Sequence, residues 1–575
     1  MRKVFLLLAL FTFTHVAYTQ TKVSGMVKDN KGKPVSGASI TLKDTYDGAV
    51  SDSTGKYSFQ TTEKGQFILV VSAIGYKGIE QPLNLAGGSM DVPLVLKEEI
   101  NEMKAVVITA GSFEASDRKR AAVVLDPIDI VTTASANGDV TQALKTLPGA
   151  QQVGESEGLF VRGGTAAETN IFIDGTLVNK FFFSSGPNIA GYGRFSPFLF
   201  KGTVFSTGGY SALYGQALSS AVILESIDLP EQTSASLGIS MLSLSAGFQH
   251  LNQKKTASWG FSGAYTNLGP AFAVLKQKQD YFQVPSIFNG EGNFRIKTSS
   301  SGMLKYYGTL STNKLGFTTP SLDSAGYFDK FSLDNINIYH NLSWKERIGN
   351  YWKLAAGISY TNNRDEIAGA MRDGGGKDVT LGGLEFKNFR LKPTGNYTNA
   401  KLVLERRLSG LSAIRFGSEY NHTNDRTVFT DNNNNRYQET LKETVTSLFA
   451  ESDIYLTNAL AAKVGTRLER SAYLDRFNIA PRLSLAYKLG DNSQASLAYG
   501  IFYQNPESRY LPSTAGLDFS KATHYIAQYQ KVGSQRVFRA EVFYKKYDQL
   551  IKTGFANGRD GIAINNNGFG DAKGF

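Results

Sequence analysis

The second half of the chain, from about residue 230 to residue 575, consists of long segments in which apolar and polar residues alternate. In "ASLAYGIFYQ", Leu497, Tyr499 and Ile501 share one face of an extended chain, and Phe502 breaks the opposite, polar face. The segment "RVFRAEVFYKK" repeats the pattern, with Phe543 as the exception on its polar face. Successive side chains of a β-strand point to opposite faces, so each segment predicts a strand with one apolar and one polar face.

The length of these segments and the polar turns between them favour a membrane barrel over a soluble β-sandwich, in whose strands apolar and polar residues would also alternate. The segments reach about ten residues, the length that crosses an outer membrane, and polar turns such as "DNNNNRY" and "RDGGGKD" separate them. After residue 20, no run reaches the about 18 apolar residues that a membrane helix needs. We therefore expect residues 230–575 to form a transmembrane antiparallel β-barrel, because a chain that spans a bilayer with strands must close them on one another.

The N-terminus predicts export from the cytoplasm. Residues 1–20, "MRKVFLLLALFTFTHVAYTQ", combine a charged start, an apolar stretch and a cleavage region near Gln20, as a signal peptide does. The chain contains no cysteine, which excludes disulfides and thiolate metal sites. Its formal net charge is +11, but the basic residues are dispersed among acidic ones, so we expect no nucleic-acid partner.

Residues 21–97 predict a small β-sandwich, in which short strand-like runs alternate with turns. The runs "SGMVKDNKGKPVSGASITLKD", "DSTGKYSF" and "VVSAIGYKG" resemble the carboxypeptidase-regulatory-like domain that precedes many outer-membrane receptors. A zinc carboxypeptidase needs closely spaced His and Glu ligands, and this stretch contains no histidine. We therefore expect a non-catalytic domain in a molecule that is mainly β.

Residues 120–229 predict a small α+β domain. Asp139, followed three residues later by a glutamine, has the spacing of a capping box and predicts a short helix. The stretch "GLFVRGGTAAETNIFIDGTLVN" then predicts a strand, a turn at Gly163 and Gly164, and a returning strand. The returning strand is expected to end in a tight turn at Asp174 and Gly175.

The motifs "LPG", "VRGG", "IDG" and "YGQALSSAV" follow one another between residues 147 and 222. This order resembles the plug domain of TonB-dependent outer-membrane receptors of the Bacteroidetes type. The resemblance marks a plug motif of five residues: Arg162, Gly163, Gly164, Asp174 and Gly175. The glycines also suit tight turns on conformational grounds alone. Arg162 is a candidate for bidentate pairing with acidic barrel residues, and simple solvation is the alternative.

The predicted barrel is incomplete at its C-terminal end. We expect about 14 membrane-crossing strands in residues 230–575, whereas the receptors that the chain resembles use about 22 around a plug. An open edge would leave backbone groups unpaired in hydrocarbon. The ending "GIAINNNGFGDAKGF" resembles an internal strand of the family, so we expect the natural protein to continue; an unusually small closed barrel is the alternative.

The sequence contains no motif for catalysis, metal binding or nucleotide binding. "DNNNN" starts like a calcium loop but lacks its glycine and its bidentate glutamate. No Gly-Lys-Ser or Gly-Lys-Thr phosphate loop occurs. None of the histidines belongs to the helical zinc motif: His15, His250, His340, His422 and His524. We therefore expect a protein that is not an enzyme and that carries no cofactor.

Residues 98–119 predict a linker with one isolated strand, "AVVITA", that has no hairpin partner nearby. Its position and texture resemble the TonB box, the segment that pairs with an energy-transducing protein by strand addition. The predicted box consists of Val106, Val107, Ile108, Thr109 and Ala110. The alternative is that this strand is the last one of the preceding sandwich.

The resemblance implies a receptor in the outer membrane of a Gram-negative cell, surrounded by outer-membrane lipid, with its N-terminal domain in the periplasm. It would bind an extracellular nutrient and import it with energy from a TonB-type inner-membrane complex. The nutrient class stays open between a siderophore, a vitamin, a peptide and an oligosaccharide, because selectivity lies in loops. The alternative function is a signalling or adhesion barrel without active transport. A glycan importer with a surface partner is a further possibility.

Overall fold

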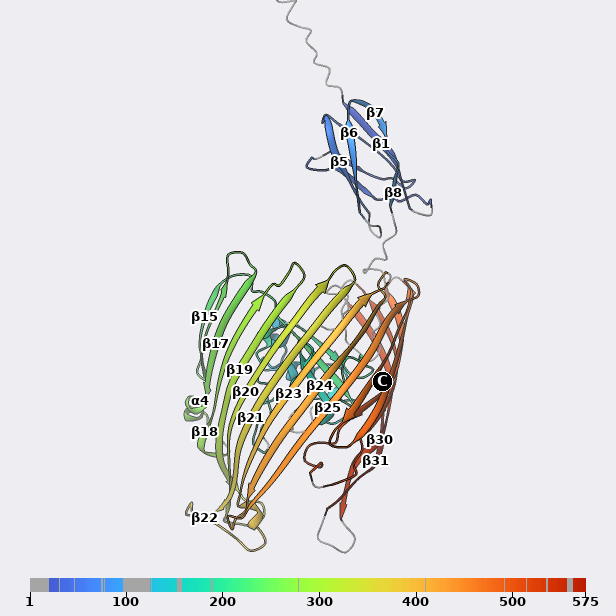
Figure 1. Cartoon of the computed structure of the whole chain (residues 1–575). Helices are drawn as coiled ribbons and strands as arrows, with labels where there is room; N and C mark the ends of the chain where they lie inside the picture. Colours follow the sequence, from blue (N-terminus) through green and yellow to red (C-terminus); the bar gives the residue numbers. More distant parts are fainter. Residues whose placement is uncertain are drawn as a thin grey trace, which may run out of the picture. The chain divides into compact units, whose positions relative to one another are not determined.

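The computed structural model contains two compact units, residues 1–105 and 106–575 (Figure 1). The predicted signal peptide, apart from Gln20, and the whole predicted linker with its box lie outside the described residues. The structure describes residues 20–29, 32–45, 47–73, 76, 78–96, 125, 127–151, 158–187, 189, 191–277, 279–408, 410–490, 492–512, 514–533, 536–555 and 562–575.

The first unit contains the two packed sheets that the sequence predicts. Alternate residues of both sheets, among them Val23, Ile40 and Leu69, are fully buried in one core. One sheet contains β1 (Thr21–Asp29), β4 (Lys56–Thr61), β7 (Gly88–Asp91) and β8 (Leu94–Leu96). The other has the order β3 (Gly48–Val50), β2 (Ser39–Leu42), β5 (Gly65–Ser72) and β6 (Ile79–Leu85).

The predicted plug contains two short helices and a four-stranded sheet. Asp139 caps α3 (Val140–Leu144), since its Oδ1 accepts the Gln142 backbone N–H at 2.8 Å. The Gln142 side chain donates to the carbonyl of Gly191 at 3.2 Å and not to the backbone N–H of Asp139, so only half of the predicted capping box is present. The remaining elements are α2 (Pro127–Thr132), β9 (Ala150–Gln151), β10 (Phe160–Val161), η1 (Ala166–Glu168), β11 (Thr169–Ile173), β12 (Thr176–Leu177), η2 (Pro197–Leu199), β13 (Phe200–Ser206) and β14 (Ser220–Ser226).

The strand pairing around the plug motif corrects the sequence prediction. Strand β10 pairs with β9, whereas β11 lies between β12 and β14 in the order β12-β11-β14-β13, so no hairpin joins β10 to β11. Arg162 and Gly163 have φ angles of 49° and 79°. Two successive left-handed residues form a tight turn, and the Gly164 N–H donates to the Val161 carbonyl at 2.9 Å. The turn is therefore at Arg162 and Gly163, one residue before the predicted position.

The tight turn predicted at Asp174 and Gly175 is confirmed. Their φ angles are 49° and 93°, the left-handed pair of a type I′ hairpin turn. The turn joins β11 to β12 through the pairs Ile173 with Thr176 and Phe172 with Leu177. It therefore places the short strand β12 at the edge of the plug sheet.

The second unit is dominated by one antiparallel sheet of seventeen strands that curves around the plug (Figure 1). Seventeen exceeds the predicted number, because β22 has two residues and β15 is rich in Ser, Ala and Gly. The described residues include no pairing between β15 and β31, and the prediction that the natural chain continues stays a prediction. The strands are β15 (Ser234–Ile239), β16 (Ser243–Leu251), β17 (Ala257–Asn267), β18 (Asp280–Ile296), β19 (Met303–Pro320), β20 (Phe328–Ile348), β21 (Trp352–Arg372), β22 (Asp378–Val379), β23 (Phe389–Arg407), β24 (Ala413–Thr430), β25 (Arg436–Tyr455), β26 (Leu460–Ser471), β27 (Arg476–Gly490), β28 (Ser493–Gln504), β29 (Ser520–Val532), β30 (Val537–Phe555) and β31 (Ile562–Gly574).

The two ends of the barrel differ in their connections. At one end, short turns such as 349–351 and 408–412 join the strands. At the other end lie longer connections, including 373–388, which contains β22 and η3 (Glu385–Lys387), and 505–519. The connection before β18 contains α4 (Gly269–Val274). No helix within the described ranges has the length and apolar character needed to cross a bilayer.

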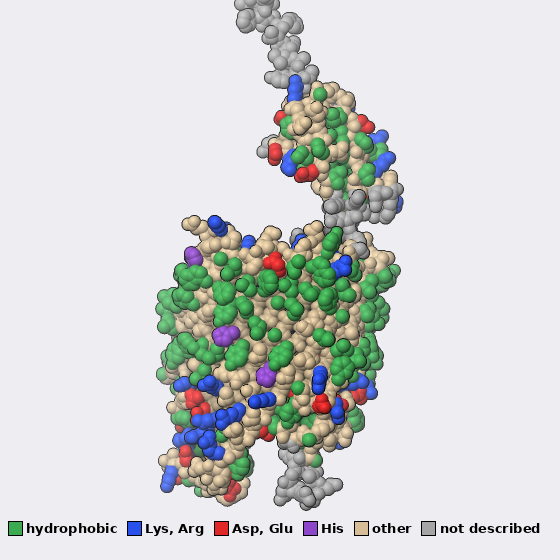
Figure 2. Space-filling view, viewed as in Figure 1, with side chains coloured by type: hydrophobic (Ala, Val, Ile, Leu, Met, Phe, Trp, Pro, Cys, Tyr) green, Lys and Arg blue, Asp and Glu red, His purple; other side chains and the backbone are tan. Residues whose placement is uncertain are grey.

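The two faces of the barrel strands have the predicted character. Leu497 and Val542 are 57% and 61% exposed on the outside, where apolar side chains form a broad band (Figure 2). In Figure 2, Lys and Arg gather near the end that carries β22. Phe502 and Phe543, the exceptions in the alternation, both turn inward: Phe502 is fully buried against Tyr210 of the plug, with ring centroids 4.5 Å apart. Phe543 lies under the guanidinium of Arg162. Both exceptions are therefore contacts between plug and barrel.

We predict that the sandwich loses stability at high pH through Tyr57. This side chain is buried, and its hydroxyl donates to the Val92 carbonyl at 2.8 Å. Burial, followed by the nearby charge of Asp91, raises the pKa of Tyr57 to about 12. The contribution should therefore be complete below pH about 10, the ordinary tyrosine pKa, and disappear as the pH rises toward 12.

The test is thermal unfolding of residues 21–97 between pH 8 and pH 12, with and without Tyr57→Phe. The variant should be less stable by about 1 kcal/mol at pH 8, the value of one buried hydrogen bond, and should show a flatter alkaline decline. An equally steep decline in both proteins would contradict the assignment.

Candidate functional site

The plug loop 207–219, between β13 and β14, is held by charged side chains of the barrel wall. Arg482 on β27 donates through Nη1 to the carbonyl oxygens of Tyr210 at 3.1 Å, of Tyr214 at 2.9 Å and of Ser211. Its guanidinium also lies 4.7 Å from the Tyr210 ring centroid and 4.4 Å from that of Phe502. One buried cation thus fixes three carbonyl groups of the loop, and hydrogen bonds to charged groups are stronger than neutral ones.

A carboxylate on the wall holds the same loop through its donor groups. Glu451 on β25 accepts the Ala212 backbone N–H at 2.7 Å and the Ser211 hydroxyl at 2.9 Å. Arg482 therefore binds carbonyls, and Glu451 binds an N–H and a hydroxyl, of adjacent residues. This complementary arrangement satisfies backbone groups that form no regular secondary structure.

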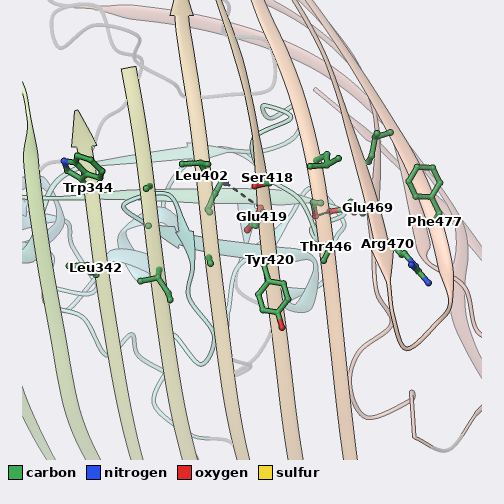
Figure 3. A pocket seen from close by; sticks show the side chains of 18 of the residues that line it. Leu342, Trp344, Leu402, Ser418, Glu419, Tyr420, Thr446, Glu469, Arg470 and Phe477 are labelled. Carbon is green, nitrogen blue, oxygen red and sulfur yellow. Dashed lines mark hydrogen bonds and ion pairs between the residues drawn. The ribbon is translucent and has the colours of Figure 1, made fainter. Parts of the chain in front are cut away.

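An ion-pair network lies beside these contacts on β24 and β26. Arg467 pairs with Glu419 at 2.9 Å and with Glu469 at 2.6 Å, and all three side chains are buried. Glu469 also accepts the Gln216 side-chain amide of the plug at 3.1 Å. Figure 3 shows this part of the wall: Glu419 is 4% exposed, whereas its neighbour Tyr420 is 42% exposed on the outer face.

Two fully buried side chains on β29 and β30 contact the end of the loop. Lys545 donates to the backbone carbonyl of Ser219 at 3.1 Å and to its hydroxyl at 3.0 Å. His524 Nε2 lies 2.8 Å from the Leu218 carbonyl oxygen and is placed to donate to it. A lysine away from water is stabilised by such acceptors, so removal of the loop would leave its charge uncompensated.

Arg162, a candidate for bidentate pairing with acidic barrel residues, pairs with one of them, but through one nitrogen only, so the bidentate geometry is not formed. Its Nη2 pairs with Glu541 on β30, and its guanidinium lies 4.6 Å from the Phe543 ring centroid. A Cβ added at Gly163 would lie 2.8 Å from the Cβ of Ala572 on β31, so this turn approaches the wall closely.

The remaining motif residues lie at the other side of the plug sheet or within it. The Asp174 carboxylate accepts the Ser226 backbone N–H at 3.0 Å and the Ser226 hydroxyl at 2.5 Å. Lys305 of β19 approaches Asp174 at 4.0 Å and donates to the Ser226 carbonyl at 2.7 Å. A Cβ at Gly164 would meet Ser219 at 2.5 Å, so its role is internal packing. The motif residues thus share no single pocket. Arg162 contacts Glu541 on one part of the barrel wall, and Asp174 lies near Lys305 on another.

Lys401 on β23 also belongs to the barrel half of the site, because its Nζ donates to the Leu213 carbonyl of the loop. This half was not predicted from sequence: Lys401, Glu419, Glu451, Arg467, Glu469, Arg482, His524, Glu541 and Lys545. The available signal was the charge on alternate residues of long strands, as in "RLERS". Charged residues inside a water-filled pore would give the same alternation. Recognising them as plug contacts requires knowledge of what occupies the barrel.

The described side chains of the site do not form a metal centre. Among the described residues, no group of three or more His, Asp and Glu side chains is placed to hold a metal ion. A hollow of about 880 Å³ on this wall is lined largely by apolar groups, including Leu342, Trp344, Leu402 and Phe477 (Figure 3). The exposed members of this lining face away from the plug, as lipid-facing residues do.

Three family models match successive parts of the chain. The model for a TonB dependent receptor-like beta-barrel matches residues 286–575, half of the chain. The chain belongs to the TonB-dependent receptor family. The TonB-dependent receptor plug domain matches residues 120–222, and a CarboxypepD_reg-like domain matches residues 23–108, which reaches into the predicted box. TonB-dependent receptors are outer-membrane β-barrels and are transporters rather than enzymes.

Curated relatives and solved structures agree with this assignment. The TonB-dependent receptor SusC of Bacteroides thetaiotaomicron is 28% identical over 221 residues, 36% of this chain and 21% of SusC. A TonB-dependent receptor of Formosa agariphila is 27% identical over 38% of this chain and 20% of its own length. The chain thus aligns with about a fifth of each curated relative.

Two solved structures share the fold of this chain. The ferric enterobactin receptor PfeA of Pseudomonas aeruginosa has a TM-score of 0.56 at 14% identity, covering 76% of this chain and 72% of PfeA. The alcaligin outer-membrane receptor FauA of Bordetella pertussis has a TM-score of 0.54 at 14% identity, covering 83% and 80%.

We predict that Glu541→Ala loosens the plug within the barrel. The substitution leaves the buried Arg162 guanidinium without its carboxylate, and breaking a buried ion pair typically costs about 3–5 kcal/mol. The chain has no cysteine, so Ala217→Cys, at a fully buried plug position, supplies a unique thiol reporter. Thiol labelling in increasing urea should begin at a lower concentration in the Glu541→Ala protein.

The matched control is Lys314→Ala, which removes an exposed ion pair with Asp334 on the same barrel. Exposed pairs contribute about 0–1 kcal/mol, so this change should leave the labelling midpoint nearly unchanged. Equal shifts in both variants would show that the buried pair does not retain the plug.

Proposed function

We propose that this receptor imports a hydrophilic nutrient into the periplasm, driven by a TonB-type protein that pulls on the N-terminal linker. The observation that carries the proposal is the plug held inside the barrel by buried charges, above all Arg482, Glu451 and Lys545. Withdrawal of the whole plug would break all of these contacts, which thermal motion alone makes rare, and even a partial rearrangement has to take place in a domain that they hold in the barrel. An external source of work is therefore part of the mechanism.

The energy source is proposed to be another protein. The sequence lacks a phosphate-binding Gly-Lys-Ser or Gly-Lys-Thr loop, and no nucleotide pool exists outside the inner membrane. The proposed box, upstream of the plug and separated from it by residues 111–119, consists of Val106, Val107, Ile108, Thr109 and Ala110. Strand addition to this segment would transmit force through a row of main-chain hydrogen bonds without demanding particular side chains.

The orientation follows from the barrel connections. Outer-membrane barrels place short turns in the periplasm and longer loops outside. The turns 349–351 and 408–412 would then face the periplasm, and the connections 373–388 and 505–519 would face the exterior. On this orientation the long connections meet the nutrient first. We propose separately that the N-terminal domain lies in the periplasm, where a TonB-type protein would reach the linker.

The nutrient class is open between a siderophore, a vitamin, a peptide and an oligosaccharide. PfeA and FauA are named for ferric enterobactin and alcaligin. At 14% identity they support the fold alone and identify no ligand. We therefore propose import of a small nutrient, without a choice among these classes.

We predict that Val107→Pro and Ile108→Pro each abolish nutrient-dependent growth. Proline removes a backbone donor from the proposed strand pairing and leaves plug and barrel untouched. The measurement is growth of cells carrying the natural gene in iron-limited, vitamin-limited and peptide- or polysaccharide-fed media, with surface expression checked.

The matched control is Ser116→Pro, in the same linker but outside the box, which should grow normally. A defect on one nutrient would identify the substrate class. Normal growth of both box variants in every medium would contradict energised import and favour the signalling or adhesion alternative.

A further inference from the structure

Two cavities that contain charged side chains lie along the same strands of the inner wall, one toward each end of the barrel. The cavity on the long-loop side has a volume of about 420 Å³ and is lined by Asn363 and Asp365 of β21, Tyr397 of β23, Asp425 of β24 and Lys180 of the plug, among others. It also includes Glu507 and Arg509 of the connection 505–519. Its lining of carboxylates, amides and cations suits a hydrophilic solute.

The cavity on the short-turn side uses earlier or later residues of the same strands. Its volume is about 580 Å³, and its lining includes Lys353 of β21, Lys401 and Glu405 of β23 and Arg415 of β24. The plug contributes residues of the β11 to β12 turn, among them Thr176. Apolar side chains such as Leu354 and Val403 complete this lining. Strands β21, β23 and β24 therefore carry a cavity with charged side chains on each side of one plug segment.

The plug segment 176–179 separates the two cavities. The Leu177 N–H donates to Asn399 Oδ1 at 3.1 Å, and the Leu177 carbonyl accepts from the Ser359 hydroxyl at 2.9 Å. The Thr176 hydroxyl accepts from the Asn341 side-chain amide at 2.7 Å. A longer contact of 3.4 Å joins the Thr361 hydroxyl to the carbonyl of Asn179.

These wall contacts differ in kind from those of the loop 207–219. The wall hydrogen bonds described for residues 176–179 all join neutral groups, whereas Arg482, Glu451 and Lys545 hold the loop with charges. Neutral hydrogen bonds contribute less than charged ones. Strand β12 is also an edge strand, paired with β11 through two residue pairs. The segment 176–179 can therefore leave the wall at a lower cost than the loop.

We propose that residues 176–179 form a gate in a hydrophilic route along the inner wall of β21, β23 and β24. The inference rests on the proposed import function and specifies where the solute passes. When the linker is pulled, the gate separates from Asn341, Ser359 and Asn399 and joins the two cavities. The loop 207–219 meanwhile stays bound to the charged wall, so most of the plug remains in the barrel.

The test is to tether the gate and, separately, the anchored loop, with the cysteine-free chain as background. A Cβ at Gly357 would lie 2.7 Å from Thr176 Cγ2, so Thr176→Cys with Gly357→Cys places two thiols within reach of a disulfide. The matched anchor tether is Leu218→Cys with Ala522→Cys, two buried residues of one plug and barrel cluster. Nutrient uptake is measured in oxidised and reduced cells, with each single-cysteine variant as control.

The expected result is loss of uptake in the oxidised gate tether, recovery after reduction, and retained uptake in the oxidised anchor tether. Loss of uptake in both tethers would overturn the gate, because the whole plug must then move. Retained uptake in the gate tether, with the disulfide confirmed by mass spectrometry, would also overturn it. Failure of the proposed import function is recognised separately. In that case nutrient uptake by the reduced tether proteins would be as low as uptake by the Val107→Pro variant.

Discussion

The structure depends on charges that are buried between the barrel wall and an irregular plug loop. A loop without secondary structure has backbone groups that need partners, and inside a barrel most of these must come from the wall. Arg482 supplies donors to three carbonyls, and Glu451 supplies an acceptor to an N–H of the same loop. Plug and barrel therefore each carry polar groups whose hydrogen-bond partners lie on the other. The contacts that stabilise the receptor also hold the plug inside the barrel.

The contacts between plug and barrel differ in kind on two sides of the plug: charged side chains make those on one side, and neutral groups make those on the other. Toward β25 to β30, the charged side chains Arg482, Glu451, Lys545 and Glu541 hold it. Toward β20 to β23, neutral hydroxyl and amide groups hold the edge strand β12. A pull through the linker would therefore act on a domain whose attachments differ in kind, and the neutral attachment of β12 lies between two cavities with charged side chains in their lining. The fold thus directs where an applied force has its effect.

The sequence predicted the periodic parts of the molecule well. Strand alternation gave the mainly β fold and the barrel, and glycine with aspartate gave the turn at Asp174 and Gly175, because local residue types decide these features. It misplaced the turn at Arg162 and missed the pairing of β10 with β9, because a non-glycine left-handed residue and a long-range register have no local signal.

The site was predictable on the plug side more than on the barrel side. The pairing of Arg162 was expected because an arginine in a pore can pair with carboxylates, although its partner Glu541 was not identified. Arg482 and Lys545 could not be told from ordinary pore-lining charges without the structure of the loop that they contact. Phe502 and Phe543 carried the clearest unused signal. Each interrupts a polar face with an aromatic ring, and each lies against the plug.

Hydrogen exchange of the intact receptor tests most directly whether charged contacts retain the plug while neutral contacts yield. The two informative amides are Ala212, which donates to Glu451 at 2.7 Å, and Leu177, which donates to Asn399 at 3.1 Å. Exchange reports the free energy of local opening, so the Leu177 amide should exchange well before that of Ala212. Equal exchange, or earlier exchange at Ala212, would contradict the division of the plug into an anchored loop and a yielding edge.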